Sequence, residues 1–302
     1  MTGQPIRLEL QPRIEAALAA LREGTGEHCL SDWSFSNLYL FRDVHRYRFI
    51  DGEWPGVSGL AYDGATHFFP LFDPGRAPIA VLHALVQAHG CLYPASPSSA
   101  AALPGDAFRI SASRDDADYL YAASAFARYE GRVLAKKRNL LRQFLSAHSP
   151  SCMAFGERTA DAAREVLQGW MAQKSKAAGE ADQQPCLEAI AHAGRFDLQG
   201  QVFLAEGRPI GFLLAQALQP GVQAIRFAKG LHSHDGIYPY MFQHFARSFG
   251  AQSGRPVEWL NFEQDMGIAG FRRSKMSYAP HALLPKLRVH SASAQDLKAR
   301  TA

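Results

Sequence analysis

The order of the predicted elements limits the fold of this chain more than any other feature, because the same order occurs in both halves. Each half reads as helix, helix, hairpin, strand, helix and strand. In the first half, residues 12–23, 31–43 and 79–90 have helical patterns, and the runs YRFIDG, SGLAYDG, THFFPLF and CLYPAS are typical of strands. Asp-Gly turns between these runs predict antiparallel hairpins. The repeat predicts an α+β fold that arose by internal duplication.

The second half follows with a strand at 151–157, helices at 161–174 and 186–193, and a hairpin at 201–217 that turns at Glu206-Gly207-Arg208-Pro209. A further strand is expected at 223–229 and a buried strand at 256–262. Between them, one apolar face indicates an amphipathic helix, and its members are Tyr238, Met241, Phe242, Phe245 and Phe249.

The two halves are joined by a segment with a long helical pattern, residues 115–148. Its apolar side chains fall on one face and its cations on the other, except that Lys137 projects from the apolar face. Lys137 either extends past the edge of the core or points into a shared cleft. We therefore expect a domain at 1–114, a basic connecting helix at 115–148 and a second domain at 149–302.

The composition indicates a well-packed globular protein, since 47% of the 302 residues are hydrophobic and 20% are charged. The four cysteines form neither a C-x-x-C pair nor a short disulfide framework. The first residues lack the apolar segment of a signal peptide, and no run approaches eighteen apolar residues. These features favour a cytoplasmic protein, with any membrane contact made peripherally.

The positive charge is concentrated in two short stretches, although the formal net charge is only +4. Residues 128–142 contain six cations and one acid, and residues 271–288 contain five cations and no acid. Focused basic clusters in a nearly balanced chain favour a localised anionic partner such as phosphate, RNA or anionic lipid.

The stretch NFEQDMGIAGFRRSKMSYAP, residues 261–280, places two carboxylates, two glycines and three cations directly after a predicted buried strand. We interpret Asp265 as a general base or acceptor-orienting residue, Glu263 as the second candidate, and Lys275 as a ligand for a phosphate or a developing oxyanion. Arg272 and Arg273 would clamp a phosphate backbone. The alternative is that both carboxylates pair with these cations and only hold the loop.

The second half also resembles the Gcn5-related acyltransferase fold, in which a sheet opens between its fourth and fifth strands to admit an acyl donor. Members that use acetyl-CoA carry a Q/R-x-x-G-x-G/A loop there, because closely spaced amides must bind a pyrophosphate. The matching stretch here is KGLHSHDGIY, residues 229–238, in which Gly230 and Gly236 are too far apart. This departure disfavours the usual CoA loop.

Three blocks, SDWSFSNLYLFR (31–42), LAKKRNLLRQF (134–144) and residues 261–280, resemble the soluble catalytic domain of bacterial phosphatidylglycerol lysyltransferases and related stand-alone proteins. The resemblance extends more weakly over nearly the whole chain. It implies two acyltransferase-like folds in tandem, joined by a long helix, and transfer of an aminoacyl group from aminoacyl-tRNA to an acceptor. No cofactor is implied, because aminoacyl-tRNA is the co-substrate.

The same resemblance suggests what the basic residues bind. Lys136, Lys137, Arg138 and Asn139 would hold the tRNA acceptor end or a lipid phosphate, and Lys229 is a further candidate for phosphate. His232, His234 and Tyr278 are candidate acceptor-site residues. The acceptor would be a phosphatidylglycerol-like lipid or a small metabolite. No metal site is expected, since His232 and His234 lack two further ligands nearby in the sequence.

Three functions remain open at this point. The first is an aminoacyl-tRNA-dependent aminoacyltransferase, and the second is an acyl-CoA N-acyltransferase with an atypical pyrophosphate loop. The third is a non-catalytic protein that binds RNA or an anionic membrane through its basic segments. The sequence does not reveal the oligomeric state.

Overall fold

The computed structural model describes residues 3–24, 30–176, 181–254 and 257–292, so that Cys29 lies outside the described residues. The chain forms two compact units. Unit 1 comprises residues 1–118, 264–268 and 284–302, and unit 2 comprises residues 119–263 and 269–283. Each unit contains a seven-stranded sheet, and the chain re-enters unit 1 twice after leaving it at Asp118.

Unit 1 is built on the sheet β1-β2-β3-β4-β5-β14-β6. Its strands are β1 (Gln4–Pro5), β2 (Arg48–Ile50), β3 (Gly56–Leu60), β4 (Thr66–Pro70), β5 (Leu92–Ala95), β6 (Phe108–Ala112) and β14 (Leu287–Ser291). β4 and β5 are parallel and are joined by α3 (Ile79–His89), whereas the other pairs are antiparallel. The predicted hairpins and the helix from Ile79 are therefore confirmed.

The other helices of unit 1 are α1 (Gln11–Gly24), α2 (Phe35–Leu40), α4 (Pro97–Ala101) and the short 3-10 helices η1 (Leu8–Leu10), η2 (Pro74–Arg76) and η3 (Arg114–Asp116). The cap of α2 is Ser34, whose Oγ accepts the Asn37 N–H at 3.2 Å. The helix expected over residues 31–43 is therefore shorter than predicted, and Ser31 and Asp32 lie before it. Ser31 instead donates its N–H and its hydroxyl to the Asp118 carboxylate, at 2.7 and 2.8 Å.

Unit 2 is built on the sheet β13-β7-β12-β11-β10-β9-β8. Its strands are β7 (Asp118–Ala122), β8 (Pro150–Ala154), β9 (Leu198–Ala205), β10 (Arg208–Gln219), β11 (Val222–Gly230), β12 (Trp259–Asn261) and β13 (Ala282–Leu284). β9 and β10 form the predicted hairpin around Glu206-Gly207. β11 and β12 are parallel and are joined by α9 (Ile237–Ser253), as β4 and β5 are joined by α3. The two units thus share the same arrangement, a mostly antiparallel sheet with one parallel pair that is joined by a helix.

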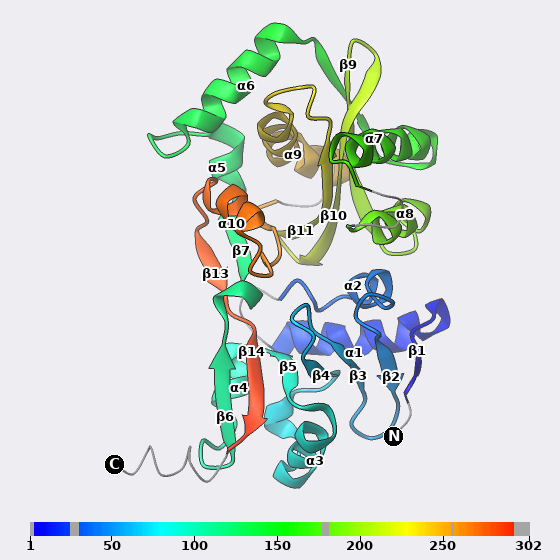
Figure 1. Ribbon diagram of the computed structural model, residues 1–302, viewed down its shortest axis with the longest axis vertical. Helices are drawn as coiled ribbons and strands as arrows, with labels where there is room; N and C mark the ends of the chain where they lie inside the picture. The colour runs from blue at the N-terminus through cyan, green and yellow to red at the C-terminus, as the bar shows by residue number, and fades with distance from the viewer. Residues whose placement is uncertain (1–2, 25–29, 177–180, 255–256, 293–302) are drawn as a thin grey trace. The chain divides into compact units, whose positions relative to one another are not determined.

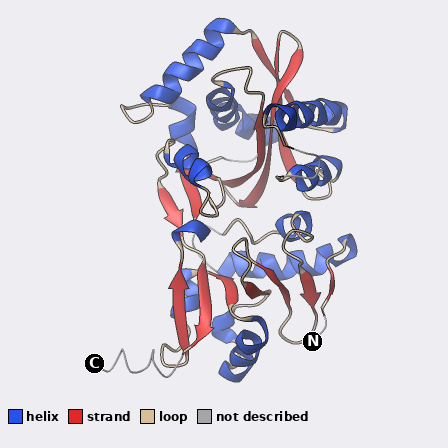
Figure 2. Ribbon diagram, viewed as in Figure 1, coloured by secondary structure: helices blue, strands red, loops and turns tan. Residues whose placement is uncertain are grey.

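The sheet of unit 2 is covered on both faces, as Figures 1 and 2 show. α9 packs on one face against β9, β10 and β11, and α7 (Ala160–Gln173) packs on the other together with α8 (Gln183–Ala191). α5 (Ala123–Arg128) and α6 (Ala135–Ala147) contact α9. The remaining helices are η4 (Glu157–Thr159) and α10 (Ala269–Met276).

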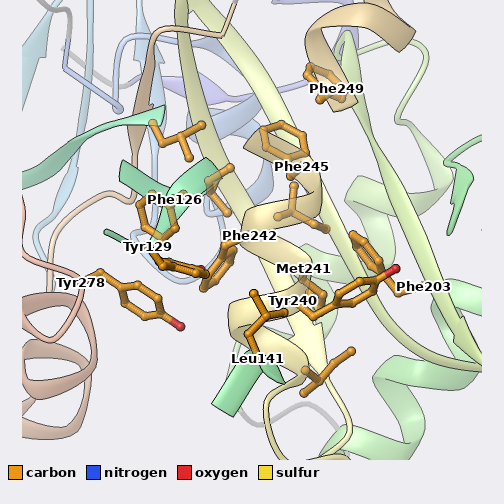
Figure 3. Packing of buried hydrophobic residues seen from close by; sticks show 14 of the residues in the cluster. Phe126, Tyr129, Leu141, Phe203, Tyr240, Met241, Phe242, Phe245, Phe249 and Tyr278 are labelled. Carbon is orange, nitrogen blue, oxygen red and sulfur yellow. The ribbon is translucent and has the colours of Figure 1, made fainter. Parts of the chain in front are cut away.

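An aromatic core holds α5, α6 and α9 on this sheet (Figure 3). Phe126 stacks on Phe262 and on Tyr278 with ring centroids 5.3 and 5.1 Å apart, and Phe242 lies edge-on to both. Buried aromatic pairs in these geometries stabilise a fold beyond the area that they bury. The amphipathic face predicted for α9 is confirmed, because Met241, Phe242, Phe245 and Phe249 belong to this core.

The prediction of one long helix over 115–148 is wrong. The segment contains η3, the strand β7, α5 and α6 in succession. β7 forms because residues 120–122 pair with β12. α5 then ends at Tyr129, which has a φ of 48°, and Gly131 follows with a φ of 79°. Two left-handed residues interrupt any helix, so the apolar positions of α5 and α6 only resembled one continuous face.

The domain boundaries predicted at 114 and 149 also differ from the structure. Each sheet contains a strand from outside the domain that was predicted for it. β7 follows β6 in sequence but joins the sheet of unit 2, beside β12. β14, close to the C-terminus, joins the sheet of unit 1 between β5 and β6. The C-terminal part of the chain is therefore an internal component of unit 1.

A buried ammonium group holds these separate stretches of unit 1 together. Lys286 is fully buried, and its Nζ lies 2.7 Å from Asp118 Oδ1 and pairs with Asp32. It also donates to Ser31 Oγ at 3.2 Å and to Gln264 Oε1. Burial opposes the charge, but the two carboxylates outweigh it and raise the pKa of Lys286 above that of an ordinary lysine.

Replacing Lys286 with methionine is expected to lower the free energy of unfolding by about 3–5 kcal/mol, because two buried carboxylates would lose their counter-ion. Urea denaturation of Lys286→Met and of wild type would measure the difference. Lys174→Met, at an exposed position, is the control and should change stability by at most about 0.5 kcal/mol. Similar small losses in both variants would contradict this role of Lys286.

Candidate active site

The sheet of unit 2 divides where β11 continues beyond its pairing with β12. The two strands pair from Val222 and Trp259 to Ala224 and Asn261, whereas β11 runs on to Gly230. On its other side, β11 has a bulge against β10, because Ala215 lies opposite Ile225 and Leu214 opposite Phe227. The extra residue is Arg226. A bulge of this kind redirects the side chains of a strand and is common beside functional sites.

Arg226 brings a buried cation to this division. Its Nε and Nη2 donate to Gln216 Oε1 at 3.1 and 2.9 Å, and its Nη1 lies 2.6 Å from Glu263 Oε1. The Arg226 side chain is 2% exposed and that of Glu263 is 25% exposed. The guanidinium therefore fixes the Glu263 carboxylate at the point where β12 ends.

Glu263 lies in a turn that other side chains hold in place. It has a φ of 58°, and its N–H donates to Asn261 Oδ1 at 2.7 Å. The Glu263 carbonyl accepts from the Tyr119 N–H at 3.2 Å and from Lys275 Nζ at 3.1 Å. A left-handed backbone in a residue other than glycine costs free energy, and such strain is found mainly at functional sites.

Lys275 approaches this turn from α10. Its Nζ donates to the Phe262 carbonyl at 2.6 Å and lies 5.6 Å from the centre of the Tyr119 ring. The Lys275 carbonyl accepts from the Tyr121 hydroxyl at 2.8 Å, which ties α10 to β7. The structure thus brings Glu263 and Lys275 together within unit 2.

Asp265 has a different environment, within unit 1. It is fully buried, its Oδ1 accepts the Gly267 N–H at 2.9 Å, and its Oδ2 lies 3.3 Å from Arg114 Nη1. These contacts hold the 264–268 turn. Asp265 and Lys275 belong to different units, and the role of Asp265 as a base or acceptor-orienting residue stays a prediction.

Lys229, near the end of β11, is buried against α7 and α8. Its Nζ lies 2.7 and 2.8 Å from the two carboxylate oxygens of Asp182 and 4.1 Å from the centre of the Trp170 ring. Asp182 therefore neutralises the positive charge of Lys229, the residue predicted to bind a phosphate. Sequence reasoning missed Asp182 and Arg226, because neither lies in a recognisable motif.

The basic residues of α6 have separate roles in the structure. Lys136 and Asn139 are exposed, Asn139 Oδ1 accepts a hydrogen bond from Arg142, and Arg138 donates to the carbonyls of Tyr129 and Gly131. Lys137 Nζ lies 3.8 Å from the centre of the buried Tyr278 ring. Burial, and then the charge of Lys136, lowers the pKa of Lys137 to about 8.

α10 carries the other predicted phosphate ligands, Arg272 and Arg273, on a helix with no buried residue. Phe271 and Met276 on the same helix are 49% and 44% exposed. Cations next to exposed apolar side chains are typical of a surface that meets anionic lipid.

The loop between β11 and α9 contains the two predicted acceptor-site histidines. The His232 N–H donates to Gln173 Oε1 at 2.6 Å, and His234 Nδ1 lies 3.0 Å from Ser233 Oγ. Burial lowers the pKa of both imidazoles below that of an ordinary histidine. The third candidate, Tyr278, is 5% exposed, and burial raises the pKa of its hydroxyl.

The first turn of α9 is covered by α6. Gly236 has a φ of 90°, and a Cβ at this position would lie 2.4 Å from the Leu140 carbonyl oxygen and 2.9 Å from Phe144 Cβ. Glycine is thus required here by backbone conformation and by close approach. In acyl-CoA enzymes, the corresponding helix N-terminus is where a pyrophosphate is expected.

Residues 27–290 match the family described as phosphatidylglycerol lysyltransferase, C-terminal. The chain belongs to this family. A search of curated proteins gave no match. In the described part of this phosphatidylglycerol lysyltransferase family member, no helix has the length and apolar character needed to cross a membrane.

Solved structures show the same fold. A conserved protein of unknown function from Bacteroides thetaiotaomicron has a TM-score of 0.77 at 20% identity, over 97% of this chain and all of that one. The C-terminal domain of a putative lysylphosphatidylglycerol synthetase from Agrobacterium fabrum has 0.61 at 13% identity, over 96% of both chains. L-PGS from Bacillus licheniformis has 0.60 at 13% identity, over 99% of this chain and 96% of that one. The expected tandem acyltransferase-like fold is confirmed.

The position of Lys137 gives a testable pH dependence. Because its folded-state pKa of about 8 lies below the 10.5 of an ordinary lysine, the cost of burying its charge is fully present below about pH 8. That cost disappears as the pH rises from about 8 towards 10.5. The amine should therefore become nucleophilic at unusually low pH.

Competitive labelling with trace acetic anhydride, read by mass spectrometry, would measure this pKa directly. Labelling of Lys137 should reach half of its maximum near pH 8, with Lys136 as an internal reference on the same peptide. A Lys137 profile centred above pH 10 would show that the ammonium is not buried as described.

Proposed function

We propose that the chain is an aminoacyltransferase that moves an aminoacyl group from aminoacyl-tRNA to a hydroxyl or amine acceptor. The observation that carries the proposal is the division of the sheet between β11 and β12, where Glu263 and Lys275 meet in a chain of this family. The aminoacyl ester is already activated, so the enzyme has chiefly to position two substrates and stabilise the tetrahedral intermediate.

In this proposal Lys275 stabilises the negative charge. Its ammonium group is oriented by the carbonyls of Phe262 and Glu263 and would donate to the ester carbonyl oxygen as that oxygen becomes an oxyanion. The acceptor oxygen or nitrogen forms a bond to the carbonyl carbon, the ester bond to the ribose breaks, and the ribose hydroxyl of tRNA leaves with a proton.

Glu263 is the better placed of the two carboxylates to take the acceptor's proton. It is partly exposed and shares unit 2 with Lys275, and Arg226 orients it. Asp265 is fully buried and bonded to Gly267 and Arg114. We therefore assign Glu263 as the base or acceptor-orienting group and give Asp265 the role of holding the turn beside it.

The donor is tRNA rather than CoA in this proposal, and the close contact of Gly236 with Leu140 supports this choice. The α6 backbone leaves little room beside Gly236 at the α9 N-terminus. The cations of α6 would bind the tRNA phosphates, and such contacts weaken as salt rises. No further cofactor is needed.

The acceptor is a phosphatidylglycerol-like lipid or a small metabolite. The exposed Phe271 and Met276 beside Arg272 and Arg273 favour the lipid, because this helix could contact the anionic inner face of the membrane peripherally. The reaction would then take place on the cytoplasmic side, where aminoacyl-tRNA is made.

The direct experiment incubates the protein with each tRNA charged with a radiolabelled amino acid, together with phosphatidylglycerol vesicles or a metabolite extract. We expect label to appear in one acceptor and to disappear if the tRNA is digested with RNase beforehand. Absence of transfer with every tRNA, together with absence of tRNA binding at low salt, would disprove the proposal.

Variants test the assigned roles. Lys275→Ala should lower kcat by about 10²–10³, the usual loss when one oxyanion donor is removed. Glu263→Gln should also lower kcat, whereas Arg208→Ala, an exposed cation at the start of β10, should leave the rate unchanged. Equal rates for wild type and Lys275→Ala would remove Lys275 from the mechanism.

The two other functions predict different results. An acyl-CoA N-acyltransferase would bind CoA saturably and lose that binding when the 230–236 loop is altered. A non-catalytic protein would bind tRNA or anionic vesicles without turnover.

A further inference from the structure

Three side chains from separate connections of unit 2 meet beside the C-terminal end of α6. His148 is the residue that follows α6, Glu206 lies in the turn between β9 and β10, and His234 lies in the loop between β11 and α9. One ligand atom of each, a ring nitrogen or a carboxylate oxygen, lies within 4.8 Å of the other two. The three residues are distant in sequence, and only the fold brings them together.

The spacing of these atoms matches a metal site. His148 Nδ1 lies 3.5 Å from Glu206 Oε2. In a tetrahedral zinc site with bonds of about 2.0–2.2 Å, two neighbouring ligand atoms lie about 3.3–3.5 Å apart. His148 and Glu206 thus already have this separation, and a ring nitrogen of His234 lies within 4.8 Å of both ligand atoms.

Neighbouring groups orient two of the three side chains. Glu206 Oε1 accepts the Ser149 N–H at 3.2 Å, which directs Oε2 towards His148. Ser233 Oγ lies 3.0 Å from His234 Nδ1, which leaves Nε2 as the ligand atom of that ring. Hydrogen bonds of this kind fix the orientation of liganding residues in metal proteins.

The chemistry of the ligands selects the class of metal. Two imidazoles and one carboxylate suit zinc and its neighbours in the first transition row, whereas calcium and magnesium prefer sites made of oxygen. The Glu206 side chain is 57% exposed and that of His148 is 24% exposed, so an ion can enter from solvent. A water molecule would complete the fourth position.

We propose that His148, Glu206 and His234 bind one divalent transition-metal ion of the zinc class. The ion fastens the end of α6 to the β9–β10 turn and to the loop that precedes α9. This site does not depend on the proposed aminoacyl transfer, because Glu263 and Lys275 contribute nothing to it. It replaces the expectation that His232 and His234 have no metal partners.

The test uses the full chain without an affinity tag, stripped of metal by dialysis against a chelator. Zinc chloride is titrated by calorimetry, and cobalt chloride is titrated in parallel while the visible absorption of tetrahedral cobalt is recorded. We expect one ion per chain and a thermal unfolding midpoint that rises with zinc concentration, because the ion binds the folded state.

Single variants identify the ligands. His148→Ala, Glu206→Gln and His234→Ala should each weaken zinc binding at least tenfold and remove the cobalt absorption, since loss of one of three ligands leaves an incomplete site. His232→Ala, two residues from His234 in the same loop, is the matched control and should bind zinc like wild type. Circular dichroism without metal shows whether each variant is folded.

Two outcomes would overturn the proposal. One is the absence of stoichiometric zinc or cobalt binding to folded wild-type protein. The other is zinc affinity that is the same in the three ligand variants as in His232→Ala, which would place the ion elsewhere. In either case the His148–Glu206 contact is a contact between two side chains and not part of a metal site.

Discussion

Three residue pairs join β11 to β12, and the candidate active site of unit 2 depends on how soon this pairing ends. Beyond Ala224, β11 bulges at Arg226, so a guanidinium takes the position at which β12 departs. This charge requires an acidic partner, because a buried cation without one is strongly unfavourable. Glu263 provides it at the cost of a left-handed backbone, and Lys275 then binds the two carbonyls that the turn exposes. The end of the β11–β12 pairing thus places Arg226, Arg226 positions Glu263, and the turn at Glu263 positions Lys275.

In unit 1 the corresponding role belongs to Lys286, although its purpose is structural. A lysine surrounded by Asp32, Asp118, Ser31 and Gln264 can be buried only when all of its partners are assembled. Such a centre contributes specificity of arrangement as much as stability, since an incorrect register of any segment would leave a buried charge unpaired. The two units thus use buried ion pairs for different ends. One holds chain segments together, and the other fixes the Glu263 carboxylate where the sheet divides.

The sequence was informative where the signal is local. Turn chemistry predicted the β9–β10 hairpin and one apolar face predicted α9. A short motif singled out Glu263 and Lys275, although it ranked Asp265 ahead of Glu263. Sequence reasoning failed where a long-range pairing decides the outcome. Residues 118–122 form a strand because β12 offers them a partner, which lies far away in the sequence. Arg226 and Asp182 could not be predicted, because neither a β-bulge nor an ion pair between distant segments produces a recognisable pattern in the sequence. Likewise, the partners of His234 are close only in the folded chain.

The placement of β14 has a consequence for how the protein is made. β14 lies inside the sheet of unit 1, between β5 and β6, and Lys286 immediately precedes it. On the ribosome, β1 to β6 are synthesised long before β14. β6 therefore lacks its pairing partner while unit 2 is translated. Unit 2 can complete its own sheet once β13 has emerged. Of the two units, unit 1 is therefore begun first and completed last, and a polypeptide that stops before residue 287 would lack an internal strand of unit 1.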